Sequence, residues 1–594
     1  MKLRRRRSVM EGSRIINHSL RRSRLSLLSS LLLILSLSHA GCFSGQNSSE
    51  YYGKIEVPRS QEFRWSDGGL PQTFDPAFAA APPDTDAVRA IFEGLTDYDP
   101  QTLAPVPAVA TRWESSSDAR VWTFYLRDNA HWSNGDKVTA GDFVRSWKRT
   151  VKIGQLSPHT ELLNNIVGSV ATPAGRQKPS NVKSTNQPES AAEEKYGFGA
   201  EAISDDVLRV HLQHADVNFP ALVAHPVFRP TKMAEGDVTR RLEAVGLISN
   251  GAFLLTKTES NRVLLERAKT YWDGASVTLQ RVEFVNAGAE DALAAYRAGE
   301  IDAVTSAAFE PLALKLLAPY KDFRRSTFGA LTYYSFNVSR TPFDDVRVRE
   351  ALAISIDRER VSRDDLGGAT EPAGKFLPDE MSGEKTVVSK TGLLEQDIRK
   401  AKNLLAEAGY PDGEGFPVVR LLINRNDQQR IVAQSIAAMW RSALNIQTEI
   451  IMKSWEEYEA TVKAGGYDVV RRGIVMQTTD ELTNLRMLFQ QDSQPPAELQ
   501  GKAPVDASRS HEANGHEGVV PREQRERTPG LVDSESEALK ELKAVPIYFA
   551  SSYALVKPYV SGFDANVLDA PSLKKTRIDM NWTEQRTARL LFPR

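Results

Sequence analysis

The sequence predicts a mixed α/β protein built from several lobes. Strand patterns alternate with helical patterns along most of the chain, and no short internal repeat interrupts them. At 594 residues the chain is long enough for more than one compact unit. Because it contains only one cysteine, it has no disulfide framework and must depend on a large hydrophobic core.

Residues 1–41 have the pattern of a secretory signal peptide. Met1–Arg24 carries nine Lys/Arg against one acid, and Leu25–Leu37 is almost wholly Leu, Ile and Ser. Such a short apolar run cannot cross about 30 Å of hydrocarbon as a stable helix. Two small residues then precede Cys42, which resembles the lipobox of bacterial lipoproteins. We expect acylation of Cys42 and a flexible tether over 42–54, with ordinary cleavage or a retained anchor as the alternatives.

The charge of the protein changes when the leader is removed. The whole chain has a formal charge of −1, but nine of its 75 Lys/Arg lie in residues 1–41. The remaining chain is therefore acidic, which argues against nucleic acid as a partner, since that affinity comes mainly from clustered Lys and Arg. No later run reaches about 18 uninterrupted apolar residues, so no further membrane span is expected.

The first part of the body predicts a helix, a strand, a tight turn and a second helix. Asp84–Leu95 is expected to be helical because its apolar residues fall on one face. Val121–Leu126, "VWTFYL", predicts a strand, and the Asn-Gly within Ser133–Asp136 favours a hairpin-type turn. Thr139 is then expected to cap a helix over 140–151, with an aspartate at the third helical position completing a variant capping box.

The same reasoning predicts the elements that follow. Further strands are expected at Asp206–Gln213, Val418–Ile423 and Ile446–Ile451, with a strand pair in Arg262–Val285 around a Trp272-Asp273-Gly274 turn. Further helices are expected at Glu290–Ala298, Asp345–Ala353, Leu394–Ala408 and Ile431–Leu444. Thr172–Ala192 is expected to be a surface loop, and the polar stretch Gln491–Pro529 to be disordered or a long surface excursion.

No catalytic or metal-binding motif accompanies these elements. The chain has no GxSxG, no HExxH and no GxxxxGK[ST], so an exported hydrolase would lack a recognisable nucleophile and base. His211 and His214 are expected on opposite sides of one strand, and His511 and His516 have the wrong spacing for a helical zinc site. We therefore expect no enzyme activity, no metal and no cofactor.

Several segments, taken together and in order, are similar to the family 5 bacterial extracellular solute-binding proteins. These are the oligopeptide- and dipeptide-binding components of ABC importers, and the oligopeptide binders resemble this chain most. The signature-like region is "RVWTFYLRDNAHWSNGDKVTAGDFVRSWKRTV", Arg120–Val151. Other matching segments are Phe74–Phe78, Ile91–Leu95, Ile248–Leu255, Leu265–Phe284, Tyr296–Asp302, Tyr333–Val361 and Ala401–Tyr410. Colinear similarity covers about Arg64 to Arg472 and then Val545 to Phe563.

Many residues of these motifs have a structural interpretation that says little about a ligand. Core or turn packing is expected for Trp122, Trp132, Trp147 and Trp272, and structural ion pairs are expected for Arg347, Arg349 and Asp357.

The resemblance implies a periplasmic-binding-protein-like class II α/β fold with three lobes, hinged around an interlobe cleft. Lobe I would combine 55–97, 228–328 and 551–594, lobe II would be 98–227, and lobe III would be 329–550 with the polar insertion 491–529. Lobes I and III would close on the ligand by a hinge motion.

In this family an extended peptide pairs by its backbone with strands of both lobes, so main-chain bonds give affinity with little regard for sequence. Carried over residue by residue, the family's ligand contacts fall on Asn424, Gln429, Arg430, Trp455, Arg471, Gly473 and Tyr548 (or Phe549), and on Ala81 in the loop 79–83. In that loop Pro82 and Pro83 have no N–H to donate to a peptide.

The family's GWxxDY motif is where this chain departs most. The corresponding segment reads "GIVMQTTD", Gly473–Asp480. Ile474 takes the place of a tryptophan that packs on the ligand, and Gln477 that of an aspartate that neutralises the peptide's α-ammonium. Glutamine brings no charge, and Asp480 could substitute only if the strand were shifted by three residues.

The resulting hypothesis is a lipid-anchored, monomeric receptor on the periplasmic side of the cell envelope. It would deliver a peptide or peptide-like solute to the membrane subunits of an ABC permease. The alternative is a degenerate member of the same fold, a lipid-anchored envelope protein used for sensing or protein–protein contact without peptide transport. Thermal shifts with short peptides would separate the two, because a ligand that binds the folded state raises Tm.

Overall fold

The computed structural model describes residues 50–169, 197–233, 238–305, 309, 311–381, 394–490, 532 and 534–584. The predicted signal peptide, Cys42, the loop at 172–192 and the polar insertion 491–529 lie outside the described residues.

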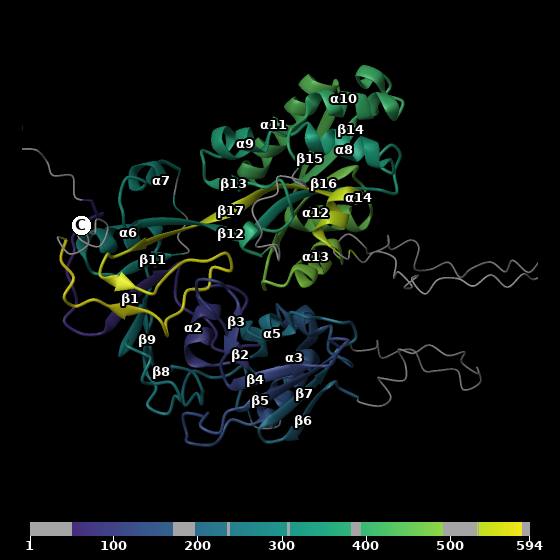
Figure 1. Ribbon diagram of the computed structural model, residues 1–594. Helices are drawn as coiled ribbons and strands as arrows, with labels where there is room; N and C mark the ends of the chain where they lie inside the picture. Colours follow the sequence, from purple (N-terminus) through teal and green to yellow (C-terminus); the bar gives the residue numbers. More distant parts are fainter. Residues whose placement is uncertain are drawn as a thin grey trace, which may run out of the picture. The chain divides into compact units, whose positions relative to one another are not determined.

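The described residues form one 11-stranded sheet, one four-stranded sheet and two strand pairs (Figure 1). The large sheet runs β15-β14-β16-β12-β17-β11-β1-β10-β9-β8, with β13 paired to β17. Its strands are β1 (Glu62–Asp67), β8 (Phe253–Thr258), β9 (Arg262–Arg267), β10 (Arg281–Val285), β11 (Ala303–Thr305), β12 (Phe323–Phe336), β13 (Thr370–Pro372), β14 (Val419–Asn424), β15 (Thr448–Lys453), β16 (Val469–Val475) and β17 (Ala544–Val556).

The smaller sheets lie within the first half of the chain and near its end. The four-stranded sheet runs β4-β5-β7-β6, with β4 (Ala110–Ser115), β5 (Val121–Leu126), β6 (Ala200–Ser204) and β7 (Val207–His211). The two strand pairs are β2 (Thr96–Tyr98) with β3 (Pro105–Pro107), and β18 (Val560–Ser561) with β19 (Arg577–Ile578). The strand predicted at Val121–Leu126 is confirmed, and its alternate residues are buried.

The two longest strands, β12 and β17, connect the two halves of the large sheet (Figure 1). They pair antiparallel from Phe323–Leu555 at one end to Ser335–Ala544 at the other, with irregular register in between. At the first end β17 also pairs with β11, and at the second end β12 also pairs with β16. Any movement of β14–β16 relative to β8–β11 must therefore bend or twist these two strands.

The helices lie between the strands, as expected for a mixed α/β chain. They are α2 (Asp84–Ile91), α3 (Ala140–Ile153), α5 (Phe219–Leu222), α6 (Ala289–Ala298), α7 (Pro311–Leu317), α8 (Val346–Ile354), α9 (Arg358–Arg360), α10 (Ile398–Glu407), α11 (Asp427–Leu444), α12 (Trp455–Lys463), α13 (Glu481–Gln490) and α14 (Glu535–Glu541). Short 3-10 or π turns are η1 (Gly154–Leu156), η2 (Thr160–Leu163), η3 (Pro226–Phe228), η4 (Val361–Asp365), η5 (Asp379–Met381) and η6 (Pro411–Gly413). Within the described ranges no helix is both long and apolar enough to span a bilayer.

Capping residues set where the helices begin. The predicted capping box of α3 is confirmed: the Thr139 backbone N–H donates to Asp142 Oδ2 at 2.8 Å. The start predicted for α11 was four residues late, because Asn426 Oδ1 accepts the Gln429 N–H at 3.0 Å and starts the helix at Asp427. The start predicted for α10 was four residues early, because Asp397 caps that helix.

The helix α2 ends at Ile91, four residues before the predicted end. Phe92 is already extended, and the next residue, Glu93, donates its backbone N–H to Asn250 Oδ1 at 3.0 Å. Arg229 also binds the carbonyl oxygen of Phe92. These two long-range contacts, which helical periodicity cannot show, outweigh the helical pattern of residues 92–95.

Two predictions about charged and polar side chains need correction. Arg347 does pair with Asp345, but the Arg349 guanidinium donates to backbone carbonyls, including Phe343 O at 2.8 Å. Asp357 caps α9 by accepting the Arg360 N–H at 2.9 Å.

The strand β7 ends at His211, so His214 is not on it, contrary to the prediction. The backbone N–H of His214 instead donates to Asn165 Oδ1 at 2.9 Å.

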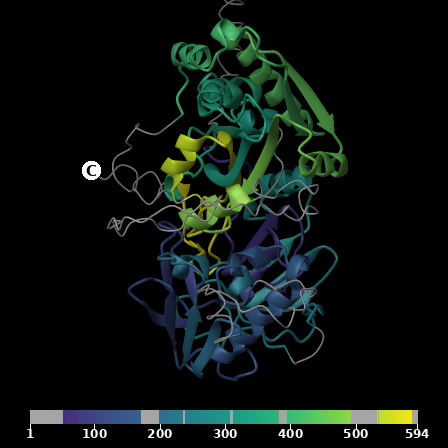
Figure 2. The ribbon, with the colours of Figure 1, turned by 90° about the vertical axis from the view of Figure 1, so that its right-hand side faces the viewer.

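Three large apolar clusters support the sheets. One surrounds Trp65, Trp132 and Trp147 and covers β1, β5, β8–β10 and α3. The second lies on one face of β12, β14 and β17 under α8, α10 and α11. The third, around Leu331 and Tyr333, lies on the opposite face of β12 with α13 and α14. The views in Figures 1 and 2 agree that α14 lies beside the elements of residues 329–490, where Glu535 Oε1 accepts the Leu377 N–H at 2.7 Å.

The last part of the predicted tether is attached to the body. The backbone N–H of Tyr52 donates to Asp322 Oδ1 at 2.9 Å, and Lys557 Nζ donates to Tyr52 O at 3.2 Å and Lys54 O at 2.8 Å. The Lys557 ammonium also lies 3.7 Å from the centre of the Tyr296 ring. Residues 51–54 are therefore part of the folded unit.

Candidate functional site

One face of the joined strands β12, β16 and β17 brings together residues from distant parts of the sequence. Tyr334 is directly opposite Arg471, and Thr332 is opposite both Gly473 and Tyr548. Residues directly opposite each other in antiparallel strands project from the same side of the sheet. Three predicted site residues, Arg471, Gly473 and Tyr548, therefore share a face with Thr332 and Tyr334, which the sequence reasoning missed.

Hydrogen bonds connect these side chains. Arg471 Nη2 donates to Thr332 Oγ1 at 3.2 Å. The first turns of α11 bring Gln429 to the same face, where its Nε2 donates to the Tyr548 hydroxyl at 2.9 Å. Burial raises the pKa of Tyr334, and the neighbouring Tyr548 raises it further while Arg471 lowers it. This surface holds one cation and several neutral polar groups.

Four polar atoms here are buried without a partner in the described part of the chain. They are Tyr334 Oη, Gln429 Oε1, Asn424 Oδ1 and Arg471 Nε. An unsatisfied buried donor or acceptor costs about 1–3 kcal/mol. Such groups are uncommon in folded proteins and call for a reason. An ordered water, or a ligand that reaches them with complementary atoms, is such a reason.

The strand β16 has an open edge next to this surface. It pairs with β14 only at Val469 and Val470, whereas its pairing with β12 continues to Val475. The Met476 N–H points toward β12, where it donates to Gly329 O at 2.7 Å. Because backbone groups alternate along a strand, those of Gly473 and Val475 point away from β12. This edge can accept a further strand.

The carbonyl of Arg471 fits the same alternation, because it accepts the hydroxyl of Tyr458 on the side away from β12. Gly473 is exposed, and a Cβ built at this position would lie 3.2 Å from Arg471 Nη2. The glycine therefore leaves space for the guanidinium beside the strand.

Trp455 is an exposed aromatic residue beside this edge. Ser454 caps α12, placing Trp455 at its first position, and the Trp455 ring stacks on Tyr458 with centroids 5.5 Å apart. With 63% of its surface exposed, Trp455 can cover a ligand without rearrangement of the core. Lys453, two residues earlier, lies opposite Asn424 at the ends of the parallel strands β15 and β14.

The structure does not bring every predicted site residue to this face. Ile474 lies on the opposite side of β16, in the apolar cluster around Leu331. Phe549, the alternative to Tyr548, belongs to the same cluster. Arg430 is separate from Gln429, since its guanidinium contacts Asp427 on the exposed side of α11.

A second group of residues surrounds Gln477 and Ala81. The Ala81 carbonyl accepts the Thr85 N–H at 3.1 Å, and the neighbouring Ala80 carbonyl lies 2.8 Å from His159 Nε2. The His159 ring is perpendicular to the His225 ring, with centroids 4.9 Å apart. His225 in turn contacts Gln477, its Nε2 lying 3.3 Å from Gln477 Oε1. Neither histidine lies in a motif that the sequence reasoning could have recognised.

Asp480 does not occupy the place of the missing aspartate. It is buried, and Asn218 Nδ2 donates to its Oδ1 at 2.9 Å. The Thr483 N–H donates to its other oxygen at 2.7 Å, which places Asp480 at the start of α13. Burial, and then the charge of Asp480, raise the pKa of nearby Asp216 to about 7.

Neither a cluster of metal-binding side chains nor the hollow beside Tyr52 overlaps this site in the described part of the chain. No group of three or more His, Cys, Asp or Glu side chains in the described ranges could hold a metal ion. A hollow of ≈ 530 Å³ lies elsewhere, between Tyr52 and α6, and contains none of the predicted site residues.

Comparison with known proteins gives a consistent result. The family model for bacterial extracellular solute-binding proteins, family 5 Middle, matches residues 104–495. The periplasmic murein peptide-binding protein MppA of Escherichia coli (strain K12) is 30% identical over 511 residues, which cover 84% of this chain and 89% of that protein. The periplasmic oligopeptide-binding protein OppA of the same strain is 28% identical over 520 residues, 86% of this chain and 91% of that protein.

A solved structure extends the similarity to the fold. The unliganded open form of the MppA murein tripeptide binding protein matches with a TM-score of 0.68 at 26% identity, covering 88% of this chain and 98% of that chain. This confirms the predicted periplasmic-binding-protein-like α/β fold. The lobe boundaries remain a prediction.

Proposed function

Because this chain belongs to the family 5 bacterial extracellular solute-binding proteins, we propose that it captures a peptide or peptide-like solute in the periplasm for an ABC permease. The family consists of solute-binding proteins rather than enzymes. The protein acts as a monomer that binds its solute reversibly, releases it intact to the membrane subunits of the permease and needs no cofactor.

The open edge of β16 carries this proposal. An extended peptide laid along Gly473 and the N–H of Val475 would gain main-chain hydrogen bonds whatever its side chains are, while the Val475 carbonyl already accepts from Gln477. The same ligand would lie beside the unpartnered atoms of Tyr334 and Arg471 and within reach of the exposed Trp455. Backbone pairing would supply affinity, and the surrounding polar groups would select the ends and the length of the ligand.

Binding would be coupled to closure about β12 and β17. We assign 55–97, 228–328 and 551–594 to lobe I, 98–227 to lobe II and 329–550 to lobe III. A ligand shifts such a protein toward its closed form only as far as it binds that form more tightly than the open one. The permease would then recognise the closed form.

Acylation of Cys42 would hold the receptor at the membrane surface. Because the folded unit begins at Tyr51, only the eight residues 43–50 separate it from the acylated cysteine. Nine residue steps span at most about 30 Å. The folded unit would thus remain close to the membrane surface, and mass spectrometry of the mature protein would detect the lipid on Cys42.

Thermal shift of the mature protein with tri- to pentapeptides tests the main proposal. A ligand at 100 times its Kd stabilises the folded state by about 2.7 kcal/mol, which is readily measured as a rise in Tm. Recovery of the peptide intact after incubation would separate a receptor from a hydrolase. A broad panel that produces no shift would contradict peptide capture.

The second candidate is a degenerate receptor used for sensing or protein–protein contact. The neutral Gln477 at the place of the family's aspartate favours it, as does the contact of the segment 477–480 with His225 and Asn218. This alternative predicts no response to the peptide panel.

A further inference from the structure

The side chain of Gln477 lies at the end of the open edge of β16 and is held at both ends of its amide. Its Nε2 donates to Val475 O at 3.1 Å, which is the last outward-facing carbonyl of the strand. Its Oε1 lies 3.3 Å from His225 Nε2. The amide thus connects the end of the edge to a residue 252 positions earlier in the chain.

Hydrogen bonding determines the protonation state of His225. The backbone N–H of Val227 can only donate, and it contacts His225 Nδ1 at 3.1 Å, so Nδ1 must accept. The ring proton then lies on Nε2 and is donated to Gln477 Oε1. Burial lowers the pKa of His225 well below its usual value, and the nearby His159 and Arg89 lower it further. The imidazole is therefore neutral.

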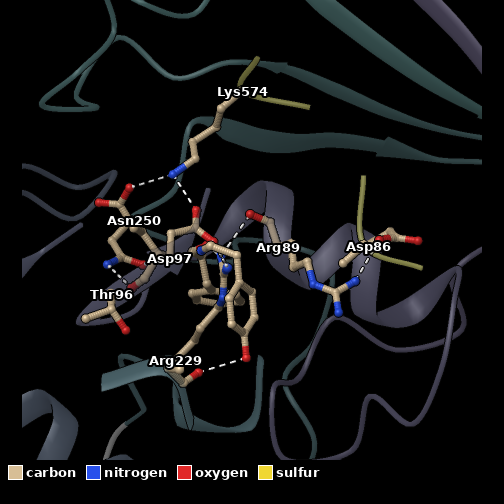
Figure 3. A network of polar contacts seen from close by, with 12 residues as sticks. Asp86, Arg89, Thr96, Asp97, Arg229, Asn250 and Lys574 are labelled. Atoms are coloured by element: carbon tan, nitrogen blue, oxygen red, sulfur yellow. Dashed lines mark hydrogen bonds and ion pairs between the residues drawn. The ribbon is translucent and has the colours of Figure 1, made fainter. Parts of the chain in front are cut away.

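The charged groups near this point are engaged with other partners. Arg89 and Arg229 both lie near His225, and each is paired with an acid: Arg89 with Asp86, and Arg229 with Asp97 at 3.5 Å. The nearby carboxylate of Asp86 is bound to Arg89 Nη1 at 2.8 Å, as Figure 3 shows. Asp480, the acid in the same segment as Gln477, is bound by Asn218 and by the start of α13. Both acids are thus turned to other groups of the protein, Asp86 to Arg89 and Asp480 to neutral donors that leave its charge in place.

We place the amino end of the ligand at Gln477 because this residue stands where the family motif has its aspartate, and a free peptide would bring an α-ammonium to that place. Removing an ammonium from water without a counter-charge is strongly unfavourable, and the neutral pair of Gln477 and His225 supplies no counter-charge. An acylated amino end carries no charge, and its amide has the same N–H and C=O groups that pair along a strand. The neutral pair of Gln477 and His225 is compatible with such an end.

We infer that the ligand of this protein is a peptide-like solute whose amino end is neutral, because it is acylated or lacks the amine, and that Gln477 with His225 selects for this end. The inference rests on the proposed function, since it places the ligand along β16. It makes Gln477 a specificity-determining residue: the altered family motif selects a different chemical class of ligand.

Isothermal titration of the full mature chain tests this with three forms of each tri- to pentapeptide: free amine, N-acetylated and des-amino. The des-amino form separates charge from size, because it is neutral and smaller than the acetylated form. We expect both neutral forms to bind at least about tenfold more tightly than the free amine, which corresponds to about 1.4 kcal/mol. Equal affinities, or tighter binding of the free amine, would overturn the inference while leaving peptide capture intact. If none of the forms binds, the proposed function fails and the inference fails with it.

The Gln477→Asp variant locates the preference at this residue. A carboxylate here should move the preference toward the free amine, by about tenfold in the ratio of the two Kd values. Gln447→Asp, at an exposed glutamine beside β15, adds the same charge elsewhere and should leave the ratio unchanged. An unaltered ratio in Gln477→Asp would show that the ligand's amino end does not lie at this residue. The comparison of peptide forms on the wild-type protein decides the inference even if the variant does not fold.

Discussion

Replacing Lys574 by methionine should destabilise the protein measurably, because this lysine compensates two carboxylates in the interior (Figure 3). Lys574 Nζ lies 3.2 Å from Glu93 Oε1 and 2.5 Å from Asp97 Oδ2. Glu93 is almost fully buried, and it also accepts hydrogen bonds from the Tyr271 hydroxyl and from Trp272 Nε1. The contacts of Lys574 with Glu93 and Asp97 therefore join the segment around residue 574 to β2 and the residues just before it.

The magnitude follows from what the substitution leaves behind. Methionine keeps most of the aliphatic side chain but removes the charge, so Glu93 loses its cation while its other partners stay. Breaking one side of a buried ion pair typically costs about 3–5 kcal/mol. Unfolding entropy is about 2.1 cal/mol/K per residue, so a chain of this size loses roughly 1 °C of Tm for each kcal/mol. We expect a fall in Tm of about 3–5 °C at neutral pH.

The pH dependence gives a second, independent measurement. Burial works to raise the pKa of Asp97, but Lys574 and then Arg229 outweigh it and hold the pKa at about 2, below the usual 3.8. A lowered carboxyl pKa stabilises the fold above the ordinary value, and that contribution disappears as pH falls toward the folded-state pKa. The Tm of wild type should therefore exceed that of Lys574→Met by a constant amount above about pH 4. This difference should become smaller as the pH falls from about 4 to about 2.

Differential scanning calorimetry across this pH range checks both expectations. Lys575→Met is the matched control, because the adjacent lysine is exposed and its replacement should leave Tm nearly unchanged. A loss below about 1 °C at pH 7 would refute the claim that Lys574 compensates a buried acid. A difference that stays constant down to pH 2 would refute the role assigned to Asp97.

Three further predictions concern the candidate site and its surroundings. Arg471→Ala should weaken ligand binding by at least about tenfold while Tm changes by less than about 1 °C, since Arg471 as a residue is only half-buried and its Nη2 bonds Thr332. A variant that fails to fold would make Arg471 structural. Tyr334→Phe removes a hydroxyl with no partner in the described part of the chain, so ligand affinity should fall without loss of Tm; a clear loss of Tm would show that the hydroxyl is already satisfied. Asp216→Asn should raise Tm at pH 8 by about 2–4 °C and hardly at pH 4. Burial and Asp480 raise the pKa of this carboxyl from 3.8 to about 7, so it lowers the stability of the fold progressively as pH rises between these values, and the amide does not. An equal effect of the substitution at pH 4 and pH 8 would contradict the raised pKa.

The sequence predicts those parts of this fold that depend on local chemistry. The capping box of α3 and the alternation of β5 are decided within a few residues, and both predictions are confirmed. The early end of α2 depends instead on Arg229 and Asn250, far away in the chain. Local periodicity contains no information about such contacts.

Residues of the candidate site could be predicted from the sequence only where they align with a motif of the family. Similarity supplied Arg471, Gly473 and Tyr548, which the sheet register brings together. Thr332 and Tyr334 were missed because their side chains join this surface through cross-strand register rather than through any pattern of their own. Alignment with the motif also does not show on which face of a strand a side chain lies. Ile474 aligns with a ligand-contacting position, yet its side chain lies on the other side of β16.

The buried polar atoms bear on whether the protein still binds a ligand. A site that has lost its ligand gains nothing from buried polar atoms that have no partner within the protein, and each costs about 1–3 kcal/mol if nothing else satisfies it. Tyr334, Gln429 and Arg471 nevertheless keep such atoms on one face, beside an edge that exposed Gly473 leaves open. A ligand that satisfies these atoms would offset that cost on binding. This distribution is expected for a working receptor with an altered ligand class, and it is difficult to explain for a degenerate one.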